Sequence, residues 1–187
     1  MAIQRSYPPL LILRHGETEW NAKGRLQGHF DAPLTQLGIA QARGQHGILA
    51  KRDLSRFRAI SSPQGRAITT ARIALEGLVP KIKTDNRLSE IGLGHWAGRL
   101  RHEVSASASE PFGFYERAPG GEGFAGLTKR CQAFLDTLES PAVLVTHGIT
   151  SRMLRLLVLG QHVASLADLP GGQGVVYLIE DGIQTRL

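Results

Sequence analysis

The sequence has very little cysteine and no long apolar run. Its 187 residues include one cysteine, Cys131, so no intramolecular disulfide can form. Cys131 falls in an apolar helical pattern, which favours a buried thiol in a reducing compartment. No apolar run approaches the length of about 20 residues that a membrane-spanning helix requires. The short run ending at Leu13 continues into polar residues without a signal-peptide cleavage site. We therefore expect a cytoplasmic protein with no membrane partner.

Patterns typical of metal sites and of nucleic-acid binding are also missing. The seven histidines show no paired ligand spacing with cysteine, and no acidic cluster suggests a two-metal centre. The 22 lysines and arginines are spread along the chain and form neither a basic tail nor an aromatic-studded patch. The net charge of +6 still favours an anionic partner. We expect no metal, no cofactor and no nucleic acid.

Short apolar runs alternate with helical patterns along the chain. Strands are predicted at residues 10–13, 58–61, 81–84, 142–145 and 175–179, the last of which is expected to close the chain. Helices are predicted at about 35–50, 66–78, 124–138 and 151–159. Because strands and helices alternate, we expect an α/β fold. The prediction is a single-domain, three-layer α/β/α sandwich over residues 1–187, with a mostly parallel central sheet.

Some segments allow more detailed predictions. Thr35 can cap the first long helix through its hydroxyl group. Apolar residues at helical spacing are expected to point from the second helix into the core: Ile68, Ala71, Ile73 and Leu75. The segment at 99–123 is rich in serine, alanine, glycine and proline, which predicts an irregular, lid-like excursion over the surface.

Two histidines stand where predicted strands end. His15 follows the first strand in Arg14-His15-Gly16, and His147 follows the fourth in His147-Gly148. In open α/β sheets the binding crevice lies beyond the carboxyl ends of the strands. If these two strands are neighbours, the two histidines would meet at one site.

The most specific signal is a long segment that begins in the first strand. It reads Leu11-Ile12-Leu13-Arg14-His15-Gly16-Glu17-Thr18-Glu19-Trp20-Asn21, followed by Arg25-Leu26-Gln27-Gly28. Four further segments follow in order: Ser62-Pro63-Gln64-Gly65-Arg66 with Thr70-Ala71, Leu88-Ser89-Glu90-Ile91 with Gly94 and Trp96, Gly120-Gly121-Glu122, and Val145-Thr146-His147-Gly148. Together they resemble the signature of the histidine phosphatase superfamily, also called the phosphoglycerate mutase-like family. The resemblance covers most of the chain.

The resemblance implies a phosphoryl-transfer site. His15 would become phosphorylated, since a neutral imidazole is a good nucleophile near pH 7. Glu90 would give a proton to the leaving alkoxide and later take one from water. Arg14, Arg66 and His147 would enclose the phosphate, the arginines through planar forks of N–H donors. Because arginines supply the positive charge, no metal is required.

Three further residues complete the predicted site. Asn21 and Gln27 match positions that line the family's phosphate pocket, and Gly148 is expected to contact the substrate. Glu17 and Glu122 are kept out of the catalytic set, because each has an ordinary structural explanation. The resulting prediction is a phosphatase that acts on a small phosphomonoester.

Two other functions compete with this prediction. Mutases of this family carry a long insertion before the Gly120-Gly121-Glu122 segment, with an adjacent arginine pair that grips the substrate. Here the interval is short and contains no such pair, and Gln27-Gly28 resembles the phosphatase form of its loop. A non-catalytic module that only binds phospholigands would not need the intact His15 and Glu90.

The chain departs from the family pattern at two positions. Ala97 stands where an acidic residue is common, and Gly123 stands where a serine is common. Neither position is assigned chemistry, so the departures bear on substrate specificity. No apolar stripe is left over after the core is assigned, so the sequence favours no particular oligomeric state.

Overall fold

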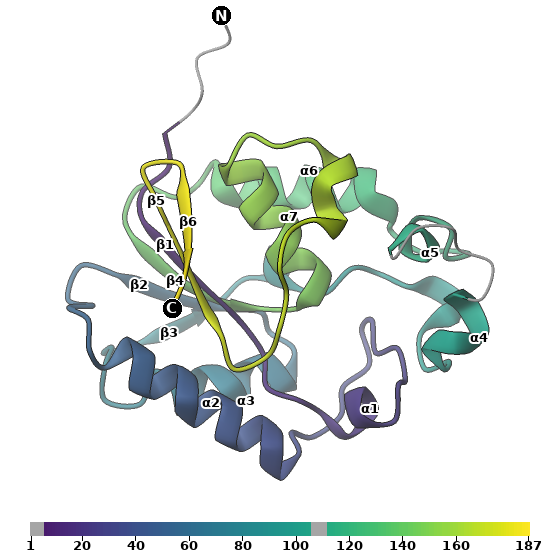
Figure 1. The fold of residues 1–187 in the computed structure, drawn as a ribbon, viewed down its shortest axis with the longest axis horizontal. Helices are drawn as coiled ribbons and strands as arrows, with labels where there is room; N and C mark the ends of the chain where they lie inside the picture. Colours follow the sequence, from purple (N-terminus) through teal and green to yellow (C-terminus); the bar gives the residue numbers. More distant parts are fainter. Residues whose placement is uncertain (1–5, 106–111) are drawn as a thin grey trace, which may run out of the picture.

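Six strands form one sheet in the computed structural model, which describes residues 6–105 and 112–187 (Figure 1). The strands are β1 (Leu10–Arg14), β2 (Arg58–Ser61), β3 (Ile82–Thr84), β4 (Ala142–Thr146), β5 (Val176–Glu180) and β6 (Ile183–Arg186). Their order across the sheet is β3-β2-β4-β1-β5-β6. The first four of these run parallel, and β5 and β6 are antiparallel to their neighbours. The predicted mostly parallel sheet is confirmed.

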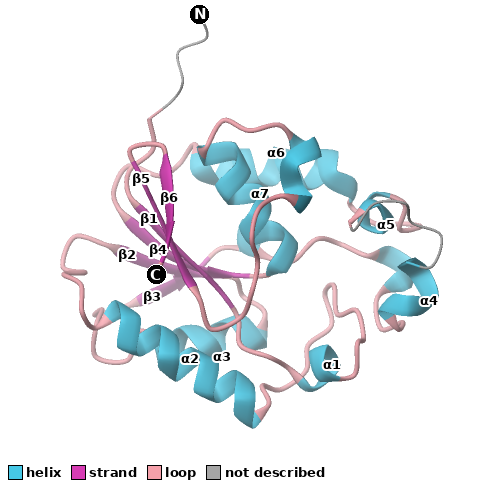
Figure 2. Cartoon of the chain, viewed as in Figure 1, coloured by secondary structure: helices cyan, strands magenta, loops and turns pink. Residues whose placement is uncertain are grey.

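Helices cover both faces of this sheet (Figure 2). The α-helices are α1 (Glu19–Ala22), α2 (Gln36–Leu49), α3 (Gly65–Ala74), α4 (Arg101–Ser105), α5 (Gly113–Glu116), α6 (Gly123–Leu135) and α7 (Gly148–Val158). Short 3-10 helices lie at Asn86–Leu88, Gly94–Trp96 and Val163–Ala167. Helices α2 and α3 lie on one face, and α6 and α7 on the other. None of the helices within the described ranges is long and apolar enough to cross a membrane.

Alternating strand residues build two apolar cores. In β1, Leu11 and Leu13 belong to the cluster under α2 and α3, whereas Leu10 and Ile12 belong to the cluster under α6 and α7. This alternation follows from the two-residue period of a strand. The buried Cys131 of α6 is part of the second cluster, as predicted. The sheet with its two helical layers is the three-layer, single-domain α/β/α sandwich that the sequence predicts.

The prediction that the strand at 175–179 closes the chain is wrong. A tight turn at Asp181 and Gly182 leads into β6, which pairs with β5. Both turn residues have positive φ angles, 51° and 74°, as a two-residue type I′ hairpin requires. The Asp-Gly pair is the sequence signal for this hairpin.

The apolar face predicted for the second helix is only partly correct. Helix α3 ends at Ala74, and its buried residues are Arg66, Ala67, Thr70, Ala71 and Ala74. Ile68 and Ile73 are half-buried. The alanines form the packing surface against the neighbouring layers. Arg66 and Thr70 lie on this same buried face, where they reach the carboxyl end of β1.

The segment at 99–123 is more ordered than predicted. Its described part contains α4 and α5, and Val104, Phe114 and Tyr115 are buried in the same cluster as α6 and α7. Residues 106–111 lie outside the described residues. The aromatic side chains explain the difference, because they bring this segment into the core, whereas the surrounding small and polar residues favour a loop.

The loop after β1 lies directly against the first turn of α2. Thr35 caps this helix by accepting a hydrogen bond from the Gly38 N–H at 3.0 Å, as predicted. A Cβ atom added at Gly38 would overlap with the Glu17 carbonyl oxygen, and one added at Gly16 would overlap with the Gly38 carbonyl oxygen. Only glycine at both positions allows this close approach.

We therefore expect opposite effects from two glycine substitutions in α2. Gly38→Ala should lower the free energy of unfolding by about 1–3 kcal/mol, because the overlap forces the loop and the helix apart. A Cβ at Gly44 meets no atom within 4 Å, so Gly44→Ala should raise it by roughly 0.5–1 kcal/mol through helix propensity. Urea unfolding of both variants tests this. Equal stability of Gly38→Ala and the wild type would contradict the packing described.

Candidate active site

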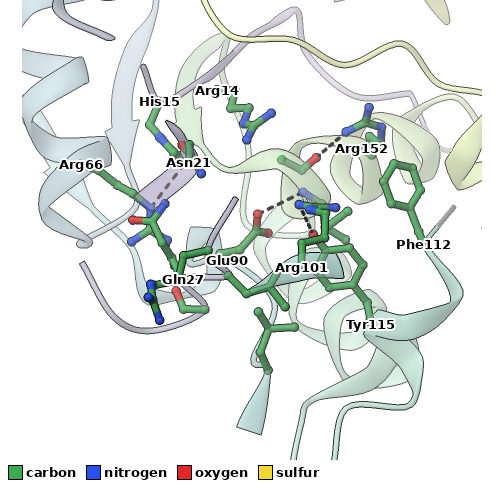
Figure 3. A pocket seen from close by; sticks show the side chains of 16 residues that line it. Arg14, His15, Asn21, Gln27, Arg66, Glu90, Arg101, Phe112, Tyr115 and Arg152 are labelled. Carbon is green, nitrogen blue, oxygen red and sulfur yellow. Dashed lines mark hydrogen bonds between the residues drawn. The ribbon is translucent and has the colours of Figure 1, made fainter. Parts of the chain in front are cut away.

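A pocket opens beyond the carboxyl ends of β1 and β4 (Figure 3). Because β1 and β4 are neighbours, the segments Arg14-His15-Gly16 and His147-Gly148 meet there, as predicted. All the predicted site residues except His147 line the pocket: Arg14, His15, Asn21, Gln27, Arg66, Glu90 and Gly148. It is also lined by Arg25, Leu26, Gly28, Leu93, Arg101, Phe112, Tyr115, Ile149 and Arg152.

His15 is held in one orientation and one tautomer. Its Nδ1 donates to the Gly16 carbonyl oxygen at 2.7 Å, so the proton of the neutral ring lies on Nδ1. The Nε2 atom then carries a lone pair, and it accepts a 3.3 Å hydrogen bond from Arg66 Nε. Burial, followed by the charges of Arg14 and Arg66, holds the pKa of His15 well below its ordinary value. The ring is therefore neutral near pH 7.

His147 lies behind His15 and is fully buried. The two ring centroids are 5.1 Å apart, and His147 Nε2 lies 2.7 Å from Ser62 Oγ. Its Nδ1 atom is buried and has no hydrogen-bond partner among the described residues. Burial, then the charges of Arg66 and of other nearby cations, lowers the pKa of His147 well below its ordinary value.

The two arginines differ in how they are held. Arg66 is nearly inaccessible to solvent and forms an ion pair with Asp31 at 3.0 Å. Its guanidinium also donates to the carbonyl oxygens of Phe30 at 2.7 Å and Gly28 at 3.1 Å. Arg14 Nε, in contrast, is buried without a hydrogen-bond partner within the described part of the chain. Burial lowers the pKa of Arg14, and the negative charge of Glu90 opposes this effect.

Glu90 is fixed by backbone donors from its own neighbour Ile91 and from the start of α7. Its carboxylate accepts hydrogen bonds from the N–H groups of Ile91 at 3.0 Å, Ile149 at 3.2 Å and Thr150 at 3.1 Å. A helix N-terminus is a favourable place for a carboxylate. A Cβ at Gly148 would lie 3.4 Å from Arg14 Cζ and 3.6 Å from Glu90 Oε2. Glycine at this position therefore keeps the space beside both side chains open.

Asn21 and Gln27 line the pocket and also support its wall. Asn21 forms a capping box with Thr18, and its Oδ1 accepts from Gln173 Nε2 at 3.1 Å. Gln27 Nε2 donates to Thr18 Oγ1 at 2.9 Å, and its buried Oε1 has no partner among the residues described. Both side chains are thus tied to the loop that follows β1.

Sequence reasoning missed several residues of the site. Asp31, which orients Arg66, is the only acidic residue between Glu19 and Asp53, and this isolation is its one sequence signal. Arg152 follows Gly148 by four residues in α7, a spacing that places both on one helix face. No pattern in the sequence indicates Arg101.

The residues kept out of the catalytic set have structural partners. Glu17 accepts a hydrogen bond from Thr35 Oγ1 at 2.8 Å. Glu122 precedes α6 and pairs with Arg130 at 2.6 Å. Within residues 6–105 and 112–187, no group of three or more histidine, cysteine, aspartate or glutamate side chains could hold a metal ion.

The two buried neutral histidines predict acid sensitivity. In the unfolded chain a histidine takes up a proton near pH 6.5, whereas His15 and His147 stay neutral in the folded state to lower pH. Below about pH 6.5 the unfolded state therefore binds more protons. The free energy of unfolding should fall as the pH drops, by up to about 1.4 kcal/mol per pH unit for each histidine.

Urea unfolding at about pH 7.5, 6.5 and 5.5 measures this fall directly. His147→Asn should reduce the slope of the unfolding free energy against pH by the equivalent of up to about one bound proton. His162→Asn, at an exposed position, should leave this slope unchanged. Unchanged wild-type stability across these pH values would contradict the neutral, buried state of the two rings.

Comparisons with known proteins identify the family. The family model described as histidine phosphatase superfamily (branch 1) matches residues 10–182. A relative from Salmonella choleraesuis (strain SC-B67), named "Probable phosphoglycerate mutase GpmB", is 37% identical over 163 residues. That match covers 80% of this chain and 74% of the relative.

Two solved structures named as phosphatases have the same fold. The alpha-ribazole phosphatase from Shigella flexneri superposes with a TM-score of 0.80 at 27% identity, covering 95% of this chain and 93% of that one. The mycobacterial glucosyl-3-phosphoglycerate phosphatase superposes with a TM-score of 0.79 at 30% identity, covering 92% of each chain. The family model spans nearly the whole sheet, and the chain therefore belongs to branch 1 of the histidine phosphatase superfamily.

Proposed function

We propose that the protein is a metal-independent phosphatase that hydrolyses a small phosphomonoester through a phosphohistidine on His15. The observation that carries the proposal is the state of His15. Its Nδ1–H is bound to a backbone carbonyl, so the Nε2 lone pair is available in a pocket that also contains Arg14, Arg66 and Glu90. A neutral, oriented imidazole beside two guanidinium groups suits in-line attack on phosphorus.

In the first step, His15 Nε2 would form a bond to phosphorus while the ester P–O bond breaks. Arg66 Nε, which now donates to Nε2, would donate to a phosphate oxygen instead. Arg14 Nε and His147 Nδ1 are buried polar atoms without partners in the described part of the chain. If the Ser62 hydroxyl donates to His147 Nε2, the Nδ1–H of that ring is free for a further phosphate oxygen.

Gln27 supports the same arrangement. Thr18 Oγ1 accepts from both Asn21 N–H and Gln27 Nε2, and its own proton needs an acceptor. If the side-chain amide of Gln27 is flipped by about 180°, its oxygen would accept this proton. Its NH₂ group would then face the pocket, where it could donate to phosphate.

Glu90 would move the proton in both steps. Glu90 would enter the first step protonated, and its carboxyl group would give that proton to the leaving oxygen as the ester bond breaks. Water would then attack the phosphohistidine, the P–N bond would break, and Glu90 would take the water's proton. The backbone donors from Ile91, Ile149 and Thr150 keep the carboxylate oriented throughout. Positive charge on Arg14 and Arg66 would take the place of a divalent cation.

Relatives are named both as phosphatases and as a mutase, so the choice between the two activities is part of the proposal. A mutase must keep its phosphorylated intermediate from water and return the group to a second hydroxyl. The interval between Glu90 and Gly120 is short and contains no adjacent arginine pair. This favours hydrolysis.

Phosphate release from p-nitrophenyl phosphate in excess EDTA tests the proposal, together with an assay of 3-phosphoglycerate interconversion. We expect release that persists in the chelator and exceeds interconversion. Faster interconversion would show a mutase. A protein that binds phosphate or vanadate, as seen in a raised melting temperature, but releases no phosphate from any ester would be a binding module.

A further inference from the structure

We infer that the outer end of the pocket binds a second anionic group of the substrate, a carboxylate or a second phosphate, through Arg101 and Arg152. The inference rests on the proposed phosphatase function, because it concerns the substrate of the same site. It narrows the substrate class to phosphomonoesters with another negative charge close to the scissile phosphate.

The first argument is the charge balance of the pocket. Among the described residues, five arginines line it, Arg14, Arg25, Arg66, Arg101 and Arg152, and Glu90 is the one acidic side chain. A dianionic phosphate at His15 would neutralise two of these charges. Positive charge would remain at the outer end, which a monoester with a neutral leaving group would leave uncompensated.

Arg152 is held rigidly at that outer end. Its Nε donates to the Leu169 carbonyl oxygen and its Nη1 to the Gly148 carbonyl oxygen, both at 3.1 Å. The guanidinium lies 4.9 Å from the centroid of the Phe112 ring. A Cβ at Gly171 would overlap with Nη2, so the glycine leaves room for this group. A guanidinium fixed in advance loses little conformational entropy on binding an anion.

Arg101 also lines the pocket and is anchored by aromatic residues. Its Nη2 donates to Tyr115 Oη at 3.1 Å, and its guanidinium lies 5.5 Å from the Phe114 ring centroid. Burial raises the pKa of Tyr115, so the phenol stays neutral and does not neutralise Arg101. Figure 3 shows both arginines on the side of Glu90 away from His15 and Arg66.

The two outer arginines repel one another. Burial chiefly lowers the pKa of Arg152, the charge of Glu90 opposes this effect, and the charge of Arg101 adds a smaller lowering. Neither arginine has a carboxylate within 4.0 Å among the described residues. An anion between them would accept donors from both groups and relieve the repulsion.

Matched ligand pairs test the inference by calorimetry on the His15→Asn protein, which should bind without turnover. The first pair is 3-phosphoglycerate and glycerol 1-phosphate, which differ by a carboxylate in place of a hydroxymethyl group. The second is fructose 1,6-bisphosphate and fructose 6-phosphate. At fixed ionic strength, the ligand with the additional anionic group should bind about tenfold more tightly in at least one pair. The pair that shows the preference identifies the anion as carboxylate or phosphate.

Variants separate the proposed subsite from general attraction by a basic protein. Arg101→Gln and Arg152→Gln, made in the same background, should each reduce the preference to about twofold or less. Arg152→Lys should retain part of it, and a melting curve shows whether each variant is folded. Arg99→Gln removes one charge from an exposed residue that pairs with Glu103, and it should leave the preference unchanged.

The outcomes also separate this inference from the proposed function. Equal affinity within both pairs, or a preference that survives both glutamine variants, would overturn the subsite even if the wild type releases phosphate. A preference that depends on Arg101 and Arg152, together with a wild type that releases no phosphate from any ester, would support the subsite and overturn the phosphatase proposal.

Discussion

Replacement of His15 by alanine should reduce phosphate release from p-nitrophenyl phosphate by at least about 10⁴-fold. The expected loss is large because, among the described residues that line the pocket, there is no other histidine and no cysteine, serine or threonine to form the covalent intermediate. His147 is adjacent, but its Nε2 is engaged with Ser62, and in the proposed tautomer its Nδ1 carries the proton, so neither nitrogen has a free lone pair. Arg14 and Arg66 would still bind and polarise the phosphate. Direct attack by water on the ester would, however, have to replace both the formation and the hydrolysis of the phosphohistidine.

His15→Asn is the better variant for interpreting this loss. The asparagine NH₂ can replace Nδ1–H as the donor to the Gly16 carbonyl oxygen, so the loop should keep its shape while the nucleophile is removed. Vanadate should still raise the melting temperature of this variant, which would show that the phosphate cradle is intact. As a control, His162→Ala at an exposed position should retain wild-type activity. Activity within about tenfold of the wild type in both His15 variants would exclude His15 as the nucleophile.

Glu90→Gln should have an effect that depends on the leaving group. An alkoxide needs a proton as it departs, so kcat/KM for an alkyl phosphate such as glycerol 1-phosphate should fall by about 10²–10⁴-fold. The p-nitrophenolate ion leaves without a proton, so kcat/KM for its ester should fall by less than about tenfold. Because kcat/KM reports steps up to loss of the alcohol, the later role of Glu90 toward water does not enter this comparison.

A matched control is available close to the site. Glu17 accepts a hydrogen bond from Thr35 and is not assigned chemistry. Glu17→Gln should therefore change kcat/KM for neither ester by more than about twofold. An equal loss in Glu90→Gln for both esters would argue that Glu90 only positions Arg14 or the start of α7. In that case the proton would have to come from another group.

The strands up to β5 and their mostly parallel pairing could be predicted from the sequence because short apolar runs and strand breakers are local signals, whereas the strand order could not. β1 and β4 are short apolar runs, and each leads directly into a polar motif at its carboxyl end. The hairpin to β6 was missed because Ile183–Arg186 is largely exposed and polar. The buried face of α3 was misjudged because hydrophobicity cannot show that Arg66 points inward toward its partners.

The inner end of the site could be predicted, and its outer end could not. Arg14, His15 and His147 stand at strand ends, so the order of the strands brings them together. Arg101 reaches the pocket only through its contacts with Phe114 and Tyr115. Such contacts depend on how a segment rich in small and polar residues packs against the core. They leave no periodic pattern in the sequence.

The phosphorylated enzyme itself gives the most direct test of the account. Wild-type protein should be mixed with substrate, quenched in alkali within the first turnovers, and examined by intact and peptide mass spectrometry. The account predicts one added phosphoryl group on the peptide that contains His15, stable in alkali and lost in acid, with a larger yield in Glu90→Gln if water attack is slowed. Turnover without any phosphorylated species, or phosphate on a residue other than His15, would contradict it.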